Sequence, residues 1–322
     1  MSKGLTDIPG LRVGHASDFA GVTGCTVILC EQGAVAGLDV RGSAANTRGA
    51  EACYPGHIVE KIHAVVLAGG SAFGLEAATG VMRYLEGRGV GFETGAARVP
   101  IVAGAILYDL AIGSSAARPD AAMGEAAAAA AGDGAVEEGS VGAGTGATVG
   151  KLFGIERAMK GGVGGATVEI AGGVKVAALV VVNAFGDVVD PSTGKPLAGA
   201  RLSAESRELA GMAASMKQGQ ARRGFTVEAN TTLVVLATNA ALNKVQASKL
   251  AAMAQAGCAR ALSPVHTMYD GDLVFALSLG EARADLNALG VAAAEAVAAA
   301  ILRGARLART LGGVPGLASW EA

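Results

Sequence analysis

The pentapeptide EANTT at 228–232 runs straight into the apolar segment LVVLA at 233–237, and this junction is the most informative stretch of the chain. Two adjacent Thr residues open what we predict to be a buried strand, because β-branched residues are frequent in strands. A polar run, MKQGQARRGF at 216–225, lies just upstream and is predicted to be exposed. This layout suits a chain that cuts itself and then uses the new N-terminal residue as a nucleophile.

The junction has a chemical interpretation and a purely structural one. A Thr hydroxyl is a poor nucleophile unless a base lies beside it. An N-terminal Thr231 would carry its own base, because a free α-amine has a pKa of about 8 and reaches the side-chain oxygen of the same residue. The structural alternative is a strand that simply begins with Thr231 and Thr232. These residues alone leave both interpretations open.

Composition limits the class of protein. The chain has 322 residues, enough for one large domain or two domains with a buried core. It carries 26 Lys and Arg against 28 Asp and Glu, a formal charge of −2, so we expect neither a nucleic-acid nor a membrane partner. Gly has about twice its usual share, which predicts closely packed backbones and many tight turns.

No segment predicts secretion or membrane insertion. The start MSKGLTDIPG lacks an apolar core, and charged residues interrupt the Ala-rich stretch at 281–310, so no apolar run reaches the ~18–20 residues that span a bilayer. The cysteines form no CxxC pair, and we expect them to be reduced and buried: Cys25, Cys30, Cys53 and Cys258. These features favour a cytoplasmic enzyme.

Short apolar runs alternate with Ala-rich helical patterns along the whole chain. The predicted strands are 25–30, 35–40, 63–68, 166–170, 174–183, 231–238 and 272–279. The predicted helices are 71–86 (N-capped by Ser71), 119–131, 200–215, 240–256 (starting after Asn239 and burying Val245) and 281–310. No linker or internal repeat divides them, so we predict one α/β domain of layered sheets and helices (α+β layered).

Two familiar motifs fail on inspection. The Gly-rich segment at 142–151 is similar to a phosphate-binding loop, but Thr145 replaces the required Gly, and Leu152 replaces the magnesium-binding Ser or Thr. Ser71 lies in a segment similar to a nucleophile elbow, but Phe73 stands where the second Gly belongs. The four His residues lack zinc-site spacing, so we expect no metal.

Two polar residues stand out in apolar surroundings. Lys151 follows the Gly-rich segment, and it is either a solvated side chain or a cation held in a cleft that stabilises an oxyanion. Asn183 ends the apolar run VKVAALVVVN, where loops gather and sites form, although Asn also simply favours turns.

A pair of carboxylates precedes the last predicted strand. Alternation along an extended chain places Asp270 and Asp272 on the same side. Two close carboxylates raise one pKa or bind a cation, as is common in catalytic sites. The alternative is a turn around Gly271 with solvated acids. His266, four residues before Asp270, is either near the same site or structural.

Taken together, six segments resemble the self-cleaving L-aminopeptidase/D-esterase family, and within it the 6-aminohexanoate-oligomer (nylon-oligomer) endo-hydrolases. The resemblance covers nearly the whole chain. The segments are LTDIPGLRVGHASD (5–18), GCTVILCEQGAVAGLDVRGSAANTRGAE (24–51), LAGGSAFGLEAATGVMRYLE (67–86), GAGTGATVGK (142–151), VVVNAFGDVVDP (180–191) and NTTLVVLATNA (230–240).

The resemblance implies an α-β-β-α sandwich of N-terminal-nucleophile type and a precursor that cuts itself. The matching bond is Asn230–Thr231, which would divide the single catalytic domain 1–322 into a 1–230 large subunit and a 231–322 small subunit. The catalytic residues implied are Thr231, Lys151, Asn183, Asp270 and Asp272, with Tyr108 binding substrate. No cofactor is implied, and the resemblance favours a homo-oligomer, a tetramer of processed heterodimers.

The peptidase branch of that family often has a Ser nucleophile with a Ser and a Glu downstream. Thr231, Asp270 and Asp272 depart from that pattern and favour the nylon-type branch. The expected activity is hydrolysis of small or oligomeric linear amides, such as 6-aminohexanoate oligomers, through an acyl ester on Thr231. One alternative is an aminopeptidase or amidase of ordinary short peptides. Another is an uncut, non-catalytic assembly or ligand-binding protein.

Overall fold

The computed structural model describes residues 3–220 and 230–320. Within these ranges one nine-stranded sheet has the order β10-β11-β14-β16-β2-β4-β7-β3, with β1 paired to β2. Its strands are β1 (Arg12–Asp18), β2 (Thr23–Val40), β3 (Thr47–Arg48), β4 (Lys61–Ala68), β7 (Val102–Ile106), β10 (Val163–Ile170), β11 (Val174–Asn183), β14 (Thr231–Ala240) and β16 (Leu273–Ala282). The pairs are antiparallel except β14 with β16 and β4 with β7.

Five α-helices and several short elements complete the described chain. The helices are α1 (Ala77–Gly87), α2 (Ala121–Ala129), α3 (Met212–Lys217), α4 (Lys244–Ala261) and α5 (Leu286–Arg306). The small sheets contain β5 (Phe92–Glu93) and β6 (Arg98–Val99), β8 (Thr148–Val149) and β9 (Met159–Lys160), and β12 (Asp187–Val189), β13 (Pro196–Ala198) and β15 (Leu262–Ser263). The short 3-10 turns include η1 (Gly4–Asp7), η3 (Ser71–Glu76) and η4 (Gly142–Gly144).

The large sheet has two halves that share β2. The first part of β2 pairs with β1 and β4, while its last residues pair with β16. Side chains alternate between the two faces of each strand. In β14, Leu233 and Val235 enter an inner core that also contains Ile28 and Leu67 from the other half. The two halves therefore pack face to face.

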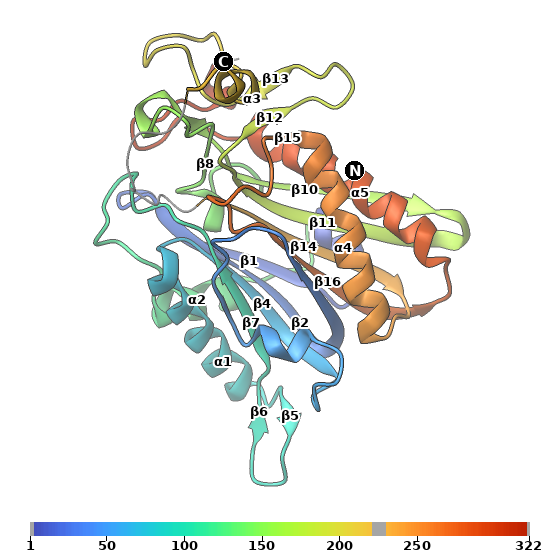
Figure 1. The fold of residues 1–322 in the computed structure, drawn as a ribbon. Helices are drawn as coiled ribbons and strands as arrows, with labels where there is room; N and C mark the ends of the chain where they lie inside the picture. The colour runs from blue at the N-terminus through green and yellow to red at the C-terminus, as the bar shows by residue number, and fades with distance from the viewer. Residues whose placement is uncertain (1–2, 221–229, 321–322) are drawn as a thin grey trace.

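Helices cover both outer faces, as Figure 1 shows. Val234 and Leu236 of β14 face away from the inner core and pack in a cluster with α4 and α5. On the other half, α1 and α2 cover β2 and β4 through residues such as Val27 and Val66. The order helices–sheet–sheet–helices is the layered α+β sandwich expected from the sequence, and that prediction is confirmed.

Every predicted strand lies in or largely within an observed one, but one predicted helix is wrong. Most of 200–215 is irregular, and α3 covers only its end. The physical reason is Asp187, whose buried carboxylate accepts the backbone N–H groups of Ala200 at 2.9 Å and Met212 at 2.7 Å. These two bonds tie both ends of the segment to β12 and override its helical pattern.

Two predicted helix starts are also wrong. Ser71 has a positive φ of 56° and opens η3 rather than capping α1. Asn239 lies in β14, where its side chain accepts the Lys175 N–H, and Asn243 instead caps α4. With the helix starting later, Val245 is 63% exposed rather than buried.

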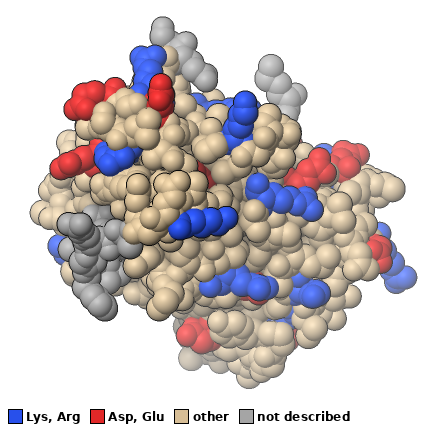
Figure 2. Space-filling view, turned by 45° about the horizontal axis from the view of Figure 1, so that its top comes forward, with Lys and Arg blue, Asp and Glu red and all other residues tan. Residues whose placement is uncertain are grey.

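The surface charge and the long helix α5 can be compared with the expectation of neither a nucleic-acid nor a membrane partner. Along the face in Figure 2, Lys and Arg side chains lie as separate groups with acidic side chains among them. By length and mean hydropathy α5 could cross a membrane, contrary to the expectation for 281–310, but most of it is buried, packed on β10 and β11. All four cysteines are buried and unpaired, as predicted.

Candidate active site

Thr231 is the first residue of β14 and is only 1% exposed. Its hydroxyl donates a hydrogen bond to the carbonyl oxygen of Asn230, the residue before it. The Gly271 N–H donates to the same oxygen at 2.6 Å. The carbonyl of the predicted cleavage bond therefore has the prospective nucleophile on one side and a backbone donor already bound to it.

Asn230 is held by a short parallel bridge to Asp270. Its backbone N–H donates to the Tyr269 carbonyl at 2.8 Å, and its side-chain amide donates to the same oxygen at 3.2 Å. Tyr269 in turn packs against Phe185, with ring centroids 5.1 Å apart. The residues on both sides of the bond are thus fixed by the turn that leads into β16.

Asn183, the last residue of β11, is the cross-strand partner of Thr231. The Lys151 ammonium donates to the Asn183 side-chain oxygen at 2.8 Å and to its backbone carbonyl at 3.1 Å. The Asn183 oxygen also accepts the Thr148 N–H at 3.0 Å, and its amide donates to the Tyr108 carbonyl at 3.2 Å. Lys151 is buried, so the solvated-Lys interpretation is wrong. The Asn183 side chain bonds to residues distant in the sequence rather than to its own turn.

The backbone beside Lys151 explains how a lysine is brought inside. Gly150 has a φ of +76°, and a Cβ there would lie 2.0 Å from the Ala200 nitrogen. The N–H groups of Gly150 and Lys151 donate to the carbonyls of Gly186 and Phe185. Only Gly fits this close approach, which directs the next side chain towards Asn183.

Asp270 and Asp272 are both 1% exposed, so the interpretation as a turn with solvated acids is wrong. Asp270 accepts the Phe185 N–H at 3.0 Å with one oxygen and the Thr267 N–H and hydroxyl with the other. Burial, and secondly the charge of Asp272, raises the pKa of Asp270 to about 6. The two carboxylates are thus buried groups whose charges affect each other, rather than a surface feature.

Asp272 bridges two segments of the site. One carboxylate oxygen accepts the Thr232 N–H at 2.6 Å, next to Thr231 in β14. The other accepts the backbone N–H of His266 at 3.2 Å, and its distance to the His266 Nδ1 is 2.9 Å. The structure thus places His266 against Asp272, one of the predicted site residues.

Residues 3–318 match the model of Peptidase family S58. The chain belongs to peptidase family S58. It is 40% identical to an uncharacterised aminopeptidase of Mycobacterium tuberculosis, with 97% of this chain and 96% of that protein covered. It is 31% identical to a 6-aminohexanoate-oligomer endohydrolase of Kocuria sp., with 93% of this chain and 85% of that protein covered.

Two solved structures are similar to this chain in fold. A β-aminopeptidase from Burkholderia sp. has a TM-score of 0.73 at 23% identity, covering 98% of this chain and 90% of that chain. An L-aminopeptidase D-Ala-esterase/amidase from Ochrobactrum anthropi, described as a variant of the Ntn hydrolase fold, has a TM-score of 0.72 at 22% identity, covering 97% and 88%. The S58 chain is therefore a hydrolase that acts on amide bonds and has an Ntn-type fold.

The S58 site also contains two buried charges that sequence reasoning missed. The Lys160 ammonium donates to the carbonyls of Thr145 at 2.7 Å and Ala147 at 2.6 Å. These two bonds stabilise the Gly-rich segment. Burial lowers the pKa of Lys160 to about 7, although the nearby charge of Asp109 opposes the shift. The local sequence gives no sign of this burial, because Glu156 and Arg157 stand just before Lys160.

A very small cavity lies next to the predicted catalytic residues. Tyr108, Asp109, Thr148 and Lys151 line a cavity of only about 10 Å³, room for one water at most. Tyr108 is half-buried and contacts Asn183 through its backbone carbonyl rather than its ring. The structure thus places Tyr108 beside two of the predicted catalytic residues, Asn183 and Lys151.

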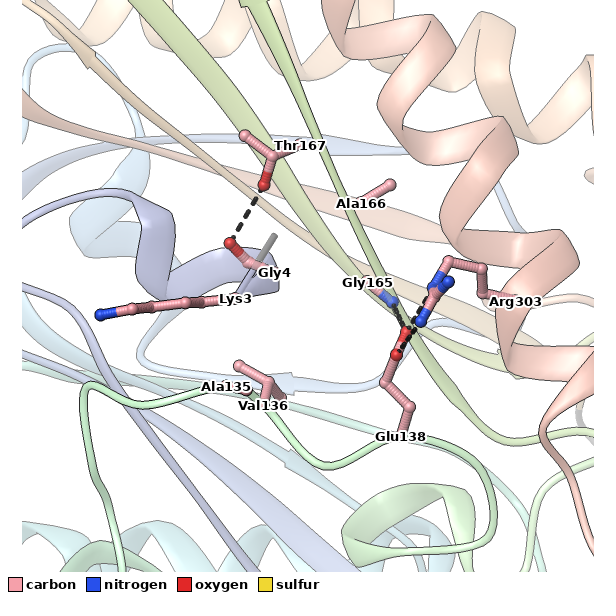
Figure 3. Close-up of a pocket in the computed structure, with 9 residues that line it drawn as sticks. All are labelled: Lys3, Gly4, Ala135, Val136, Glu138, Gly165, Ala166, Thr167 and Arg303. Carbon is pink, nitrogen blue, oxygen red and sulfur yellow. Dashed lines mark hydrogen bonds and ion pairs between the residues drawn. The ribbon is translucent and has the colours of Figure 1, made fainter. Parts of the chain in front are cut away.

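A much larger cavity, about 450 Å³, lies elsewhere, between η1, β10 and α5 (Figure 3). Glu138 there accepts the Gly165 N–H at 2.7 Å and forms an ion pair with Arg303. None of the predicted site residues lines it. Within residues 3–220 and 230–320, no three His, Cys, Asp or Glu side chains are placed to bind a metal ion.

Proposed function

We propose that this chain is a self-processing amide hydrolase that cuts its Asn230–Thr231 bond and then uses Thr231 as an N-terminal nucleophile. The observation that supports this best is the scissile carbonyl itself. The Asn230 oxygen already accepts a hydrogen bond from the Gly271 N–H at 2.6 Å and another from the Thr231 hydroxyl. A donor at this oxygen stabilises the charge that develops there when the carbonyl is attacked.

Self-processing would proceed through an ester. The Thr231 oxygen attacks the Asn230 carbonyl carbon, and the Gly271 N–H stabilises the resulting oxyanion. The C–N bond then breaks, and the proton lost by the hydroxyl ends on the departing Thr231 nitrogen. Water hydrolyses the ester, which leaves a carboxylate on Asn230 and a free amine on Thr231. The products are the 1–230 and 231–322 subunits.

Substrate turnover would reuse the same groups. The new α-amine takes the hydroxyl proton of Thr231 as the hydroxyl attacks the substrate amide. Asn183 and the Gly271 N–H are the proposed oxyanion donors, and the Lys151 ammonium fixes Asn183 and adds positive charge to the site. Asp270 and Asp272 would orient the Thr231 amine and hydroxyl. Water then releases the acyl group.

The proposed substrates are linear amides, with 6-aminohexanoate oligomers as the specific candidate. The 31%-identical Kocuria endohydrolase supports this choice, together with Thr231 and the acidic pair. Ordinary short peptides are the second candidate, supported by the 40%-identical mycobacterial protein named as an aminopeptidase. Tyr108, which lines the small cavity beside Lys151, is the proposed substrate contact. We also propose a cytoplasmic homo-oligomer, a tetramer of processed heterodimers.

The experiment is mass spectrometry and N-terminal sequencing of purified protein, followed by assays with 6-aminohexanoate oligomers and aminoacyl-amides. Two fragments are expected, and the smaller should begin TTLVV. A start at Thr232 would move the nucleophile by one residue. Full-length protein that is fully active would overturn the mechanism, and uncut, inactive protein would favour the non-catalytic alternative.

A further inference from the structure

We propose that His266 is a positioning residue of the amidase site, which holds Asp272 in place and connects the buried acidic pair to solvent. This inference rests on the proposed function, because Asp272 matters for turnover only if Thr231 is the nucleophile. Neither the sequence motifs nor the implied catalytic set includes His266.

The first argument is the chain of contacts from His266 to β14. The His266 N–H and the His266 Nδ1 both lie within hydrogen-bond distance of one Asp272 oxygen, at 3.2 Å and 2.9 Å. The other Asp272 oxygen accepts the Thr232 N–H at 2.6 Å. Asp272 therefore has one oxygen on the imidazole and the other on the residue next to Thr231. A shift of the imidazole would be passed to the start of β14 through one carboxylate.

The second argument is exposure. The His266 side chain is 21% exposed, whereas the Asp272 side chain is 1% exposed. The His266 imidazole is a basic group within hydrogen-bond distance of one of the two carboxylates. Other groups at the pair are the Thr267 hydroxyl, which donates to Asp270, and the buried Cys258 thiol of α4, whose pKa the charge of Asp272 raises further. Protons can thus reach the buried pair from solvent through this imidazole.

The third argument is the backbone. His266 has a φ of +53°, a left-handed conformation that costs free energy for a residue with a Cβ. Only Val22 and Ser71 share this feature among the described non-glycine residues. A Gly would satisfy the turn at no such cost. The backbone here favours Gly, so we infer that His266 is present for the hydrogen bond between its Nδ1 and Asp272.

The test compares His266→Gly with His266→Asn in the processed enzyme. Gly suits the backbone but removes the side-chain donor, whereas Asn tolerates the left-handed conformation and keeps an N–H donor at the place of Nδ1. We expect His266→Gly to lower kcat by roughly 10-fold or more with little change in KM, and to keep or raise Tm. His266→Asn should restore kcat to within a few-fold of wild type.

The pH dependence of kcat gives a second readout. If the imidazole carries protons between solvent and the acidic pair, the pH profile of kcat should differ between His266→Asn and the wild-type enzyme. A His266→Gly enzyme with wild-type kcat would reduce the residue to a turn former and overturn the proposal. So would a folded His266→Asn enzyme that is as slow as His266→Gly. A wild-type protein that processes but hydrolyses no amide would instead refute the proposed function.

Discussion

Asn183, the last residue of β11, pairs directly across the sheet with Thr231, the first residue of β14. Neighbouring strands lie only about 4.8 Å apart, so the Lys151 ammonium bound to Asn183 is placed one strand away from the Thr231 hydroxyl. The pairing of β11 with β14 therefore brings Lys151, at the end of the Gly-rich segment, close to Thr231, although the two residues are far apart in the sequence. The residues around this pairing should respond to substitution and to pH in four ways.

Thr231→Ala should remain a full-length, inactive chain, because it lacks the hydroxyl that both processing and turnover need. Thr231→Ser should keep partial function in both steps, since the hydroxyl and the later α-amine survive. Denaturing gels and amidase assays on the two variants check this. A cut Thr231→Ala protein would show that another residue attacks.

Lys151→Met should slow self-cleavage and lower kcat by roughly 10²-fold, because Asn183 loses its buried cationic partner. The matched control is Lys249→Met on α4, where the lysine is exposed and should be dispensable. Processed fraction over time and kcat are the measurements. Equal behaviour of the two variants would make Lys151 a structural residue.

Gly271→Ala should impair self-cleavage, because a Cβ there would lie 2.9 Å from the Thr231 hydroxyl oxygen and 2.9 Å from the Ala44 carbonyl oxygen. The crowding would displace the N–H that binds the scissile carbonyl. Gly87→Ala is the control, since a Cβ at Gly87 meets no atom within 4 Å. The processing half-time of each purified precursor decides the matter, and normal processing of Gly271→Ala would remove this donor from the mechanism.

Asp270 should make stability depend on pH in the acid range. Its pKa is raised by burial from 3.8 to about 6, so the folded state holds a proton that the unfolded state releases. The stabilisation from this proton is present below pH 3.8 and is lost as pH rises through about 6. The loss amounts to roughly 3 kcal/mol at most.

Asp270→Asn should flatten that part of the stability curve, because the amide does not titrate. It should also lower kcat by roughly 10²-fold if the carboxylate orients the Thr231 amine. Chemical denaturation at several pH values and kcat measured on processed protein test the two statements separately. Asp270→Asn with wild-type turnover would leave Asp270 a purely structural role.

Local patterns predicted the strands well because alternation and β-branched runs reflect which face of a strand is buried. They predicted Asn183 at a strand end and the burial of the cysteines for the same reason. They failed at 200–215, where two backbone bonds to Asp187 override helical spacing. They left the role of His266 open and gave no sign of Lys160, because the partners of both side chains are close only in the folded chain. The polar run at 216–225 is exposed as far as residue 220, while 221–229 lie outside the described residues.

The strand order has a consequence for how the mature protein can come into being. Reading across the sheet, β11 precedes the predicted cut, β14 and β16 follow it, and β2 precedes it again. After cleavage, the shorter fragment would therefore be threaded between strands of the longer one, with hydrogen bonds on both sides and α4 and α5 packed over them. Each fragment made on its own would leave strand edges of this sheet without their partners. We therefore expect the intact chain to fold into this arrangement more readily than two separately made fragments would.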